Sequence, residues 1–137
     1  MLDVLWNNAG CGAYRVKAGA HTVQGFEPMV GVHCIATLFL TVLLLPQLQA
    51  AATREKERYS TFRGRTRVLW ISSGIAETDT PKNGINFEKL EEGTKRIGNY
   101  AVSKAGVWFL GSEFARRYHS DSILSLAINP GNLRANS

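Results

Sequence analysis

The sequence predicts an α/β fold built on a parallel, doubly wound β-sheet. Three short apolar runs, residues 2–6, 68–71 and 123–128, each end in small, polar or turn-forming residues. Runs of this kind are typical of buried parallel strands. Helical patterns lie between them, and alternating strands and helices favour a parallel sheet. Such sheets bind ligands at the carboxyl ends of their strands, so the residues after each run are the candidates for function.

Length and composition indicate one globular domain. The chain has 137 residues, 45% hydrophobic and 20% charged, which is ordinary for a globular protein. The formal net charge is +5. Its cations gather in Arg54–Arg58, where acidic residues alternate with them, and in Arg63–Arg67, which has no interleaved aromatic residues. We therefore expect a solvated loop and no nucleic-acid partner.

The cysteines and the longest apolar run bear on the compartment. Cys11 and Cys34 have no metal-ligand spacing and form no disulfide framework, which favours free thiols in a cytoplasmic protein. The run Ile35–Leu45 is closed by Pro46 and is shorter than the roughly 20 residues that cross a bilayer. We expect a buried helix there, no secretory signal, no membrane span and no metal site.

The first half of the chain reads as strand, loop and helix. After the first strand, residues 11–25 form a glycine-rich polar connection, and a long helical pattern follows from about Phe26 to Leu48. Residues 51–67 are polar and are expected to loop over the surface before the second strand.

The second half contains a long excursion and one helix. Residues 77–99 lie where a lid over a substrate could form. The helix that starts near Tyr100 is apolar on most sides and ends around Arg116 and Arg117, whose cations suit the negative end of a helix.

Tyr100 and Lys104 stand four residues apart at the start of this helix and therefore share one face. An ammonium close to a phenol favours the phenolate, so such a pair can act as an acid/base. The spacing alone is weak, because it occurs by chance in many helices.

Three further segments accompany this pair, and each follows a predicted strand. They are Asn7-Asn8-Ala9-Gly10, Ser72-Ser73-Gly74 and Asn129-Pro130-Gly131. In this order the chain resembles the short-chain dehydrogenase/reductase family, whose motifs are NNAG, a strand-terminal serine, YxxxK and PG. The resemblance runs from Leu2 to Ala135 and is closest to the retinol-dehydrogenase-like branch. It implies that residues 1–137 are a partial NAD(P)-binding domain of the Rossmann type, without the N-terminal βαβ units.

The resemblance implies three catalytic roles. Tyr100 would pass a proton to or from the substrate oxygen while hydride moves to or from the nicotinamide. Lys104 would support the phenolate and hold the nicotinamide ribose. Ser73 would donate a hydrogen bond to the substrate oxygen, although the neighbouring Ser72 leaves this assignment open by one position.

The resemblance also implies the cofactor contacts. Asn8, Ala9 and Gly10 would lie beside the adenosine half, and the Pro130-Gly131 segment would border the nicotinamide, together with Tyr100 and Lys104. The cofactor would be NAD or NADP, with a slight preference for NADP. The substrate would be a small alcohol or carbonyl compound, and a homo-oligomer is compatible with the family.

Three departures from the family pattern favour an alternative. His33 stands where the family usually has an asparagine that anchors a water leading to the lysine; a relay role and a packed, hydrogen-bonded histidine both remain open. Ala135 stands where a threonine usually meets the carboxamide. The glycine-rich turn that holds the pyrophosphate is not found. The alternative is a catalytically impaired fragment or a non-catalytic partner-binding module.

Overall fold

Three parallel strands form one sheet in chain order. The computed structural model describes residues 1–59, 64–86 and 96–131. The strands are β1 (Val4–Asn7), β2 (Arg67–Ile71) and β3 (Leu124–Ile128), with β2 in the middle. Both pairings are parallel, as the sequence predicts. The strands form where they do because their apolar side chains can be buried on a pleated surface.

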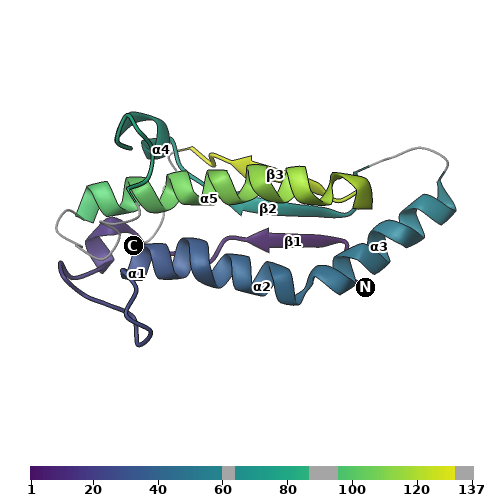
Figure 1. Ribbon diagram of the computed structural model, residues 1–137, viewed down its shortest axis with the longest axis horizontal. Helices are drawn as coiled ribbons and strands as arrows, with labels where there is room; N and C mark the ends of the chain where they lie inside the picture. Colours follow the sequence, from purple (N-terminus) through teal and green to yellow (C-terminus); the bar gives the residue numbers. More distant parts are fainter. Residues whose placement is uncertain (60–63, 87–95, 132–137) are drawn as a thin grey trace.

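Helices connect the strands, as parallel pairing requires. Figure 1 shows the longest of them lying along the sheet. Between β1 and β2 come η1 (Ala13–Arg15), α1 (Pro28–Val30), the π-helix η2 (Gly31–Ala36), α2 (Thr37–Leu43) and α3 (Leu45–Arg58). Between β2 and β3 come α4 (Ile75–Thr78), α5 (Arg96–Tyr118) and the short η4 (His119–Asp121).

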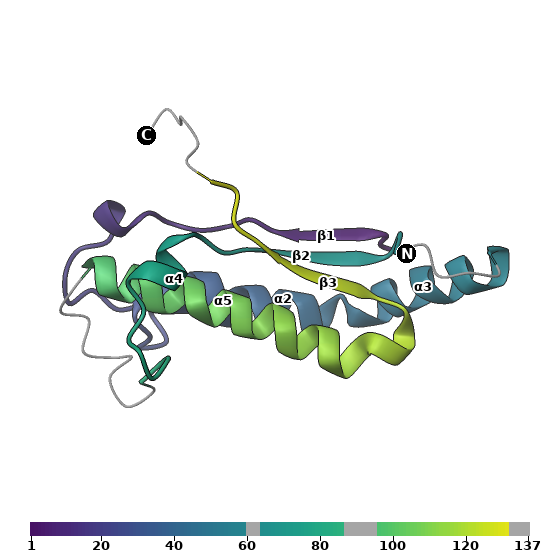
Figure 2. The same ribbon diagram turned by 90° about the horizontal axis from the view of Figure 1, so that it is seen from above.

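The described helices α2, α3 and α5 lie on one face of the sheet (Figure 2). A right-handed crossover between neighbouring parallel strands places its helix on a fixed face when the strand order runs in one direction. Both crossovers here run in the same direction, so both put their helices on the same side. The chain is thus a partial Rossmann sheet, with one of its two helical layers among the described residues.

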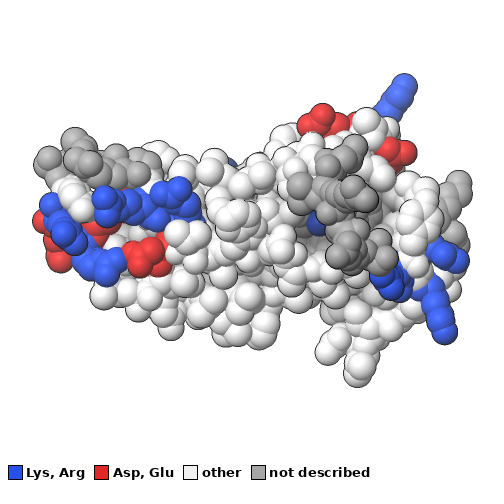
Figure 3. Space-filling view, turned by 180° about the vertical axis from the view of Figure 1, so that it is seen from behind, with Lys and Arg blue, Asp and Glu red and all other residues white. Residues whose placement is uncertain are grey.

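The opposite face of the sheet is apolar and open. Trp6, Leu69 and Leu126 are aligned across the three strands, and the exposed fractions of Trp6 and Leu126 are 58% and 41%. Seen from this side, the middle of the molecule shows mostly uncharged surface among the described residues, and most of the Lys, Arg, Asp and Glu side chains gather towards its two ends (Figure 3).

The core lies between the sheet and the helices. Its buried residues are Leu5, Leu48, Ala52, Val68, Trp70, Val107, Phe114 and Ile123. Trp70 is the largest of them, is fully buried, and donates from its indole Nε1 to the Ser125 hydroxyl at 2.9 Å. Gly111 lets α5 approach this ring, because a Cβ at that position would lie 3.1 Å from Trp70 Cδ1.

The prediction of a buried apolar helix over Ile35–Leu45 is wrong. The residues that α2 buries are Thr37 and Thr41, while its apolar side chains, such as Phe39 at 64% and Leu43 at 57%, are exposed. The polar residues His33, Thr37 and Thr41 recur every four positions and therefore share the face that meets the sheet. The apolar residues between them are turned outward.

Two boundaries also differ from expectation. The helical pattern expected from Phe26 to Leu48 is interrupted at Leu44, where α2 ends. A new helix, α3, then begins with Pro46 in its first turn, which suits proline because the amide hydrogens of that turn have no partner within the helix. It continues to Arg58, so residues 51–58 are helical rather than part of a surface loop.

No single helix in the described parts of the chain is both long enough and apolar enough to cross a membrane. The helical stretches Pro28–Leu43 and Leu45–Arg58 meet that length and composition only when they are counted together, and a bend of 56° separates them.

Replacing Trp70 with alanine should lower the free energy of unfolding by about 3–5 kcal/mol, because it leaves a cavity in the core. The matched control is Trp108→Ala on α5: this tryptophan is 55% exposed, and its loss should cost about 1 kcal/mol or less. Urea unfolding followed by far-UV circular dichroism measures both. Equal losses in the two variants would contradict the placement of the core.

Candidate functional site

The start of α5 lies at the carboxyl edge of the sheet because the helix runs back along it before β3. Two reciprocal hydrogen bonds fix this contact. Lys104 Nζ donates to the carbonyl of Ile71, the last residue of β2, at 2.9 Å. The Ser72 hydroxyl donates to the carbonyl of Lys104 at 2.8 Å. The YxxxK segment is thus held against the end of β2.

Tyr100 lies between Lys104 and His33. Lys104 Nζ is 5.6 Å from the centroid of the Tyr100 ring, within the range of a cation–π contact. The His33 ring meets the Tyr100 ring edge-on, with centroids 5.7 Å apart and planes at 82°. The structure therefore brings three of the four predicted catalytic side chains into one cluster.

Among the described residues, two hydroxyl groups at this edge, those of Tyr100 and Ser73, are unengaged. Within the described residues, neither the Tyr100 nor the Ser73 hydroxyl makes a hydrogen bond. Ser72 differs, because its hydroxyl is buried and bound to the Lys104 carbonyl. Ser73 is only partly buried, which leaves its hydroxyl accessible to a ligand.

Burial governs the titration of the ionisable groups beside Tyr100. Lys104 is 7% exposed, and burial lowers its pKa. The ammonium keeps one hydrogen bond to protein and has two further donors. Burial also raises the pKa of the Cys34 thiol to about 12, against the opposing effect of Lys104. Cys34 is a free cysteine, and its thiol remains neutral and donates to the Ser103 carbonyl.

His33 is buried and bonded on both ring nitrogens. Nε2 accepts a hydrogen bond from the Cys11 backbone amide at 3.0 Å, and Nδ1 lies 2.8 Å from the Ser103 hydroxyl oxygen. Burial, with a smaller contribution from Lys104, lowers the pKa of the ring from 6.5 to about 4. His33 is therefore uncharged at neutral pH.

The predicted cofactor-contact residues follow β1 and β3 at the same edge. Asn8, Ala9 and Gly10 are all exposed. Pro130 and Gly131 are exposed as well, and Gly131 has a φ of 75°, a conformation that favours glycine. Ala135, the predicted departure in this segment, lies outside the described residues.

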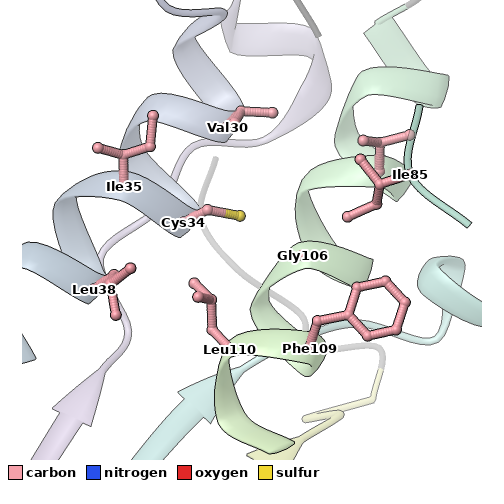
Figure 4. Close-up of a pocket in the computed structure, with 9 residues that line it drawn as sticks. Val30, Cys34, Ile35, Leu38, Ile85, Gly106, Phe109 and Leu110 are labelled. Carbon is pink, nitrogen blue, oxygen red and sulfur yellow. The ribbon is translucent and has the colours of Figure 1, made fainter. Parts of the chain in front are cut away.

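Two of the cavities that border α5 lie close to the candidate site. An apolar one of about 260 Å³ lies between α5 and the helical stretch from α1 to α2, and at its wall the Cys34 thiol points toward Gly106, where an added Cβ would lie 2.7 Å from the sulfur (Figure 4). It holds none of the candidate catalytic residues. The other, of about 230 Å³, includes Ser73, Glu77 and Asn129 in its lining, but not Tyr100.

Among the described residues, no group of three His, Cys, Asp or Glu side chains is arranged to hold a metal ion.

Sequence reasoning missed the buried polar side chains around this cluster. Ser103 lies inside the YxxxK motif, and its hydroxyl donates to the Tyr100 carbonyl at 2.7 Å. Thr37 donates to the His33 carbonyl, and Thr41 accepts from Asn7 Nδ2 at 2.9 Å. The sequence signal that could have revealed them is the four-residue spacing of His33, Thr37 and Thr41 within an apolar run.

Stability should fall as the pH decreases from about 6.5 to about 4. Above this pH range the His33 ring is neutral in both the folded and the unfolded chain. Within it, the unfolded chain takes up a proton that the folded chain does not, which costs on the order of 2–3 kcal/mol at the lower end. Urea unfolding at a series of pH values measures this loss.

The free energy of unfolding of His33→Asn should lack the part of the pH dependence that the imidazole causes. The difference in unfolding free energy between this variant and the parent chain should therefore shrink as the pH falls. His119→Asn alters an exposed histidine and should leave the profile unchanged. Parallel profiles for the parent chain and His33→Asn would contradict the neutral buried ring.

The known proteins that are similar to this chain in sequence belong to one family. No protein-family model matches the chain. It is 42% identical over 134 residues to the short-chain dehydrogenase/reductase iacJ of Pestalotiopsis fici, covering 96% of this chain and 38% of that protein. A short-chain dehydrogenase/reductase of Phomopsis amygdali is 40% identical over 136 residues, with the same two coverages.

The fold agrees with this relationship. The NADPH-bound carbonyl reductase from chicken fatty liver superimposes with a TM-score of 0.64 at 23% identity, covering 98% of this chain and 51% of that one. The chain spans 38% of the length of the curated relatives named above. The order of the motifs, the parallel sheet and the sequence identity together place the chain in the short-chain dehydrogenase/reductase family.

Proposed function

We propose that this chain contributes the catalytic edge of an NAD(P)-dependent oxidoreductase acting on a small alcohol or carbonyl compound. The observation that carries the proposal is the pairing of an unengaged Tyr100 hydroxyl with a buried Lys104 ammonium at the carboxyl edge of a parallel sheet. Ligands of open α/β sheets bind at this edge.

Tyr100 is the proton carrier in this proposal. When a substrate carbonyl is reduced, the Tyr100 hydroxyl donates a proton to its oxygen; in the reverse direction the phenolate accepts one. Lys104 stabilises the phenolate by its charge. Its hydrogen bond to Ile71 fixes the ammonium in place, so little reorganisation accompanies the proton transfer.

Ser73 is the orienting donor. Its hydroxyl is unbonded within the described residues, and it belongs to the lining of the 230 Å³ cavity. Ser72 is unsuited to this role, because its hydroxyl already holds the carbonyl of Lys104. The engaged Ser72 hydroxyl supports assigning the orienting role to Ser73 in this proposal.

The residues at the sheet edge fit a nicotinamide cofactor, as the name of the NADPH-bound relative suggests. The bound nicotinamide would supply or accept the hydride. Asn8, Ala9 and Gly10 offer a small, exposed backbone for the adenosine half. Pro130 and Gly131 border the nicotinamide in this proposal, and Lys104 has two free donors for the ribose.

A second candidate is a non-catalytic module that binds another polypeptide. The apolar, uncharged face of the sheet favours it, since large exposed apolar surfaces mark interaction sites. Binding of NADH or NADPH separates the two candidates. A cooperatively folded chain that binds neither cofactor supports the module and contradicts the oxidoreductase.

Tyr100→Phe should keep cofactor binding and lose turnover by about 100-fold or more, the usual value of general acid/base catalysis. Cofactor fluorescence measures binding, and NADPH consumption with a panel of carbonyl compounds measures turnover. Tyr118→Phe, near the other end of α5, is the matched control and should remain active. Unchanged turnover in Tyr100→Phe would overturn the assignment.

Ser73→Ala should mainly lower activity, whereas Ser72→Ala should mainly lower stability. Ser73→Ala removes the orienting hydroxyl and should lower kcat by about 100-fold with little change in stability. Ser72→Ala removes a buried hydrogen bond and should lower the free energy of unfolding by about 1 kcal/mol. Turnover and urea unfolding are measured on both variants. If Ser72→Ala loses activity without losing stability, the assignments are reversed.

A further inference from the structure

His33 links three segments of the chain that are far apart in sequence. Its Nε2 accepts from the amide of Cys11, in the loop that follows β1. Its Nδ1 bonds to Ser103 on α5, at 2.8 Å. The ring itself belongs to η2 and packs edge-on against Tyr100. One side chain thus connects the predicted cofactor loop to the helix that carries the candidate catalytic residues.

The hydrogen bonds determine where the ring carries its hydrogen. A backbone amide can only donate, so the Nε2 that faces Cys11 has no hydrogen. A neutral imidazole then carries it on Nδ1 and donates to the Ser103 hydroxyl. Ser103 completes the chain by donating to the Tyr100 carbonyl, which can only accept. All the donors and acceptors are consistent with one tautomer.

The space around the ring is matched to it. A Cβ at Gly10 would lie 3.0 Å from His33 Nε2 and 3.1 Å from its Cδ2. The loop therefore approaches the imidazole as closely as glycine allows, and a side chain at position 10 would push the ring or the loop away.

These contacts are unsuited to proton relay through His33. A relay needs an exchangeable acid or a water on both ring nitrogens, but Nε2 faces a peptide amide, which is not a proton source near neutrality. The carbonyl of His33 is engaged as well, since it accepts from the Thr37 hydroxyl. The ring atoms that could pass a proton are occupied by bonds within the chain.

We propose that His33 is a positioning residue: its neutral Nδ1–H imidazole holds the loop of Asn8 to Cys11 against α5, next to Tyr100 and Lys104. This inference rests on the proposed oxidoreductase function for its consequence, but the state of the ring is independent of it. The loop and the helix keep their spacing because both are bonded to one rigid ring.

The tautomer is tested on the chain itself, without cofactor. Long-range ¹H–¹⁵N spectra of the ¹⁵N-labelled chain at neutral pH distinguish a protonated from a bare ring nitrogen. We expect His33 to show a protonated Nδ1 and a bare Nε2, the less common form of a free histidine, whereas the exposed His21 and His119 serve as references. A protonated Nε2, or averaging between the two tautomers, would overturn the proposal.

The positioning role is tested by cofactor affinity. His33→Phe keeps an aromatic ring without the two hydrogen bonds and should weaken NADPH binding by about 10-fold, because a loop that these bonds no longer hold must be ordered when the cofactor binds. His119→Phe is the control. Binding as tight in His33→Phe as in the parent chain would overturn the positioning role. A parent chain that binds no cofactor but has the Nδ1–H ring would count against the oxidoreductase alone.

A double-mutant cycle provides a third measurement. Gly10→Ala should destabilise the parent chain more than it destabilises His33→Asn, because asparagine has no atom where the imidazole Nε2, the ring atom nearest to an added Cβ, lies. Urea unfolding of the four chains measures this coupling. Additive effects would show that the loop does not rest on the ring and would contradict the proposal.

Discussion

The reciprocal hydrogen bonds between Lys104 and the end of β2 are the contact on which the site depends. Lys104 Nζ binds the Ile71 carbonyl, and Ser72 binds the Lys104 carbonyl. A buried ammonium is stable only with such partners. Both bonds lie where β2 ends, so the position of Tyr100, one helical turn earlier, follows from the position of the strand.

The strands, and the sheet edge at which the candidate residues gather, could be predicted because their signals are local. Apolar runs followed by small or polar residues gave β2 and β3 within a residue of their observed bounds. A parallel sheet then brings the loops that follow them to one edge. The prediction for Ile35–Leu45 failed because hydrophobic content does not say which side of a helix meets the sheet. There, the polar residues His33, Thr37 and Thr41 face inward.

His33 shows what sequence alone leaves open. Relay and packing are both reasonable for a histidine in a helix, and the choice depends on partners from distant segments, Cys11 and Ser103. Likewise, the sequence could not choose between Ser72 and Ser73. Only the contact with the Lys104 carbonyl separates the two hydroxyls, because it engages one of them in the interior.

The three tryptophans occupy three different environments: Trp70 is in the core, Trp6 is on the open face of the sheet, and Trp108 on α5 lines the 230 Å³ cavity beside Ser73. Indole emission depends on contact with water, so each ring is an intrinsic fluorescent reporter of a different surface. A soluble quencher reaches Trp6 and Trp108 but not Trp70. Single-tryptophan chains would therefore distinguish a molecule that covers the open face of the sheet from one that enters the cavity beside Ser73, without any added label.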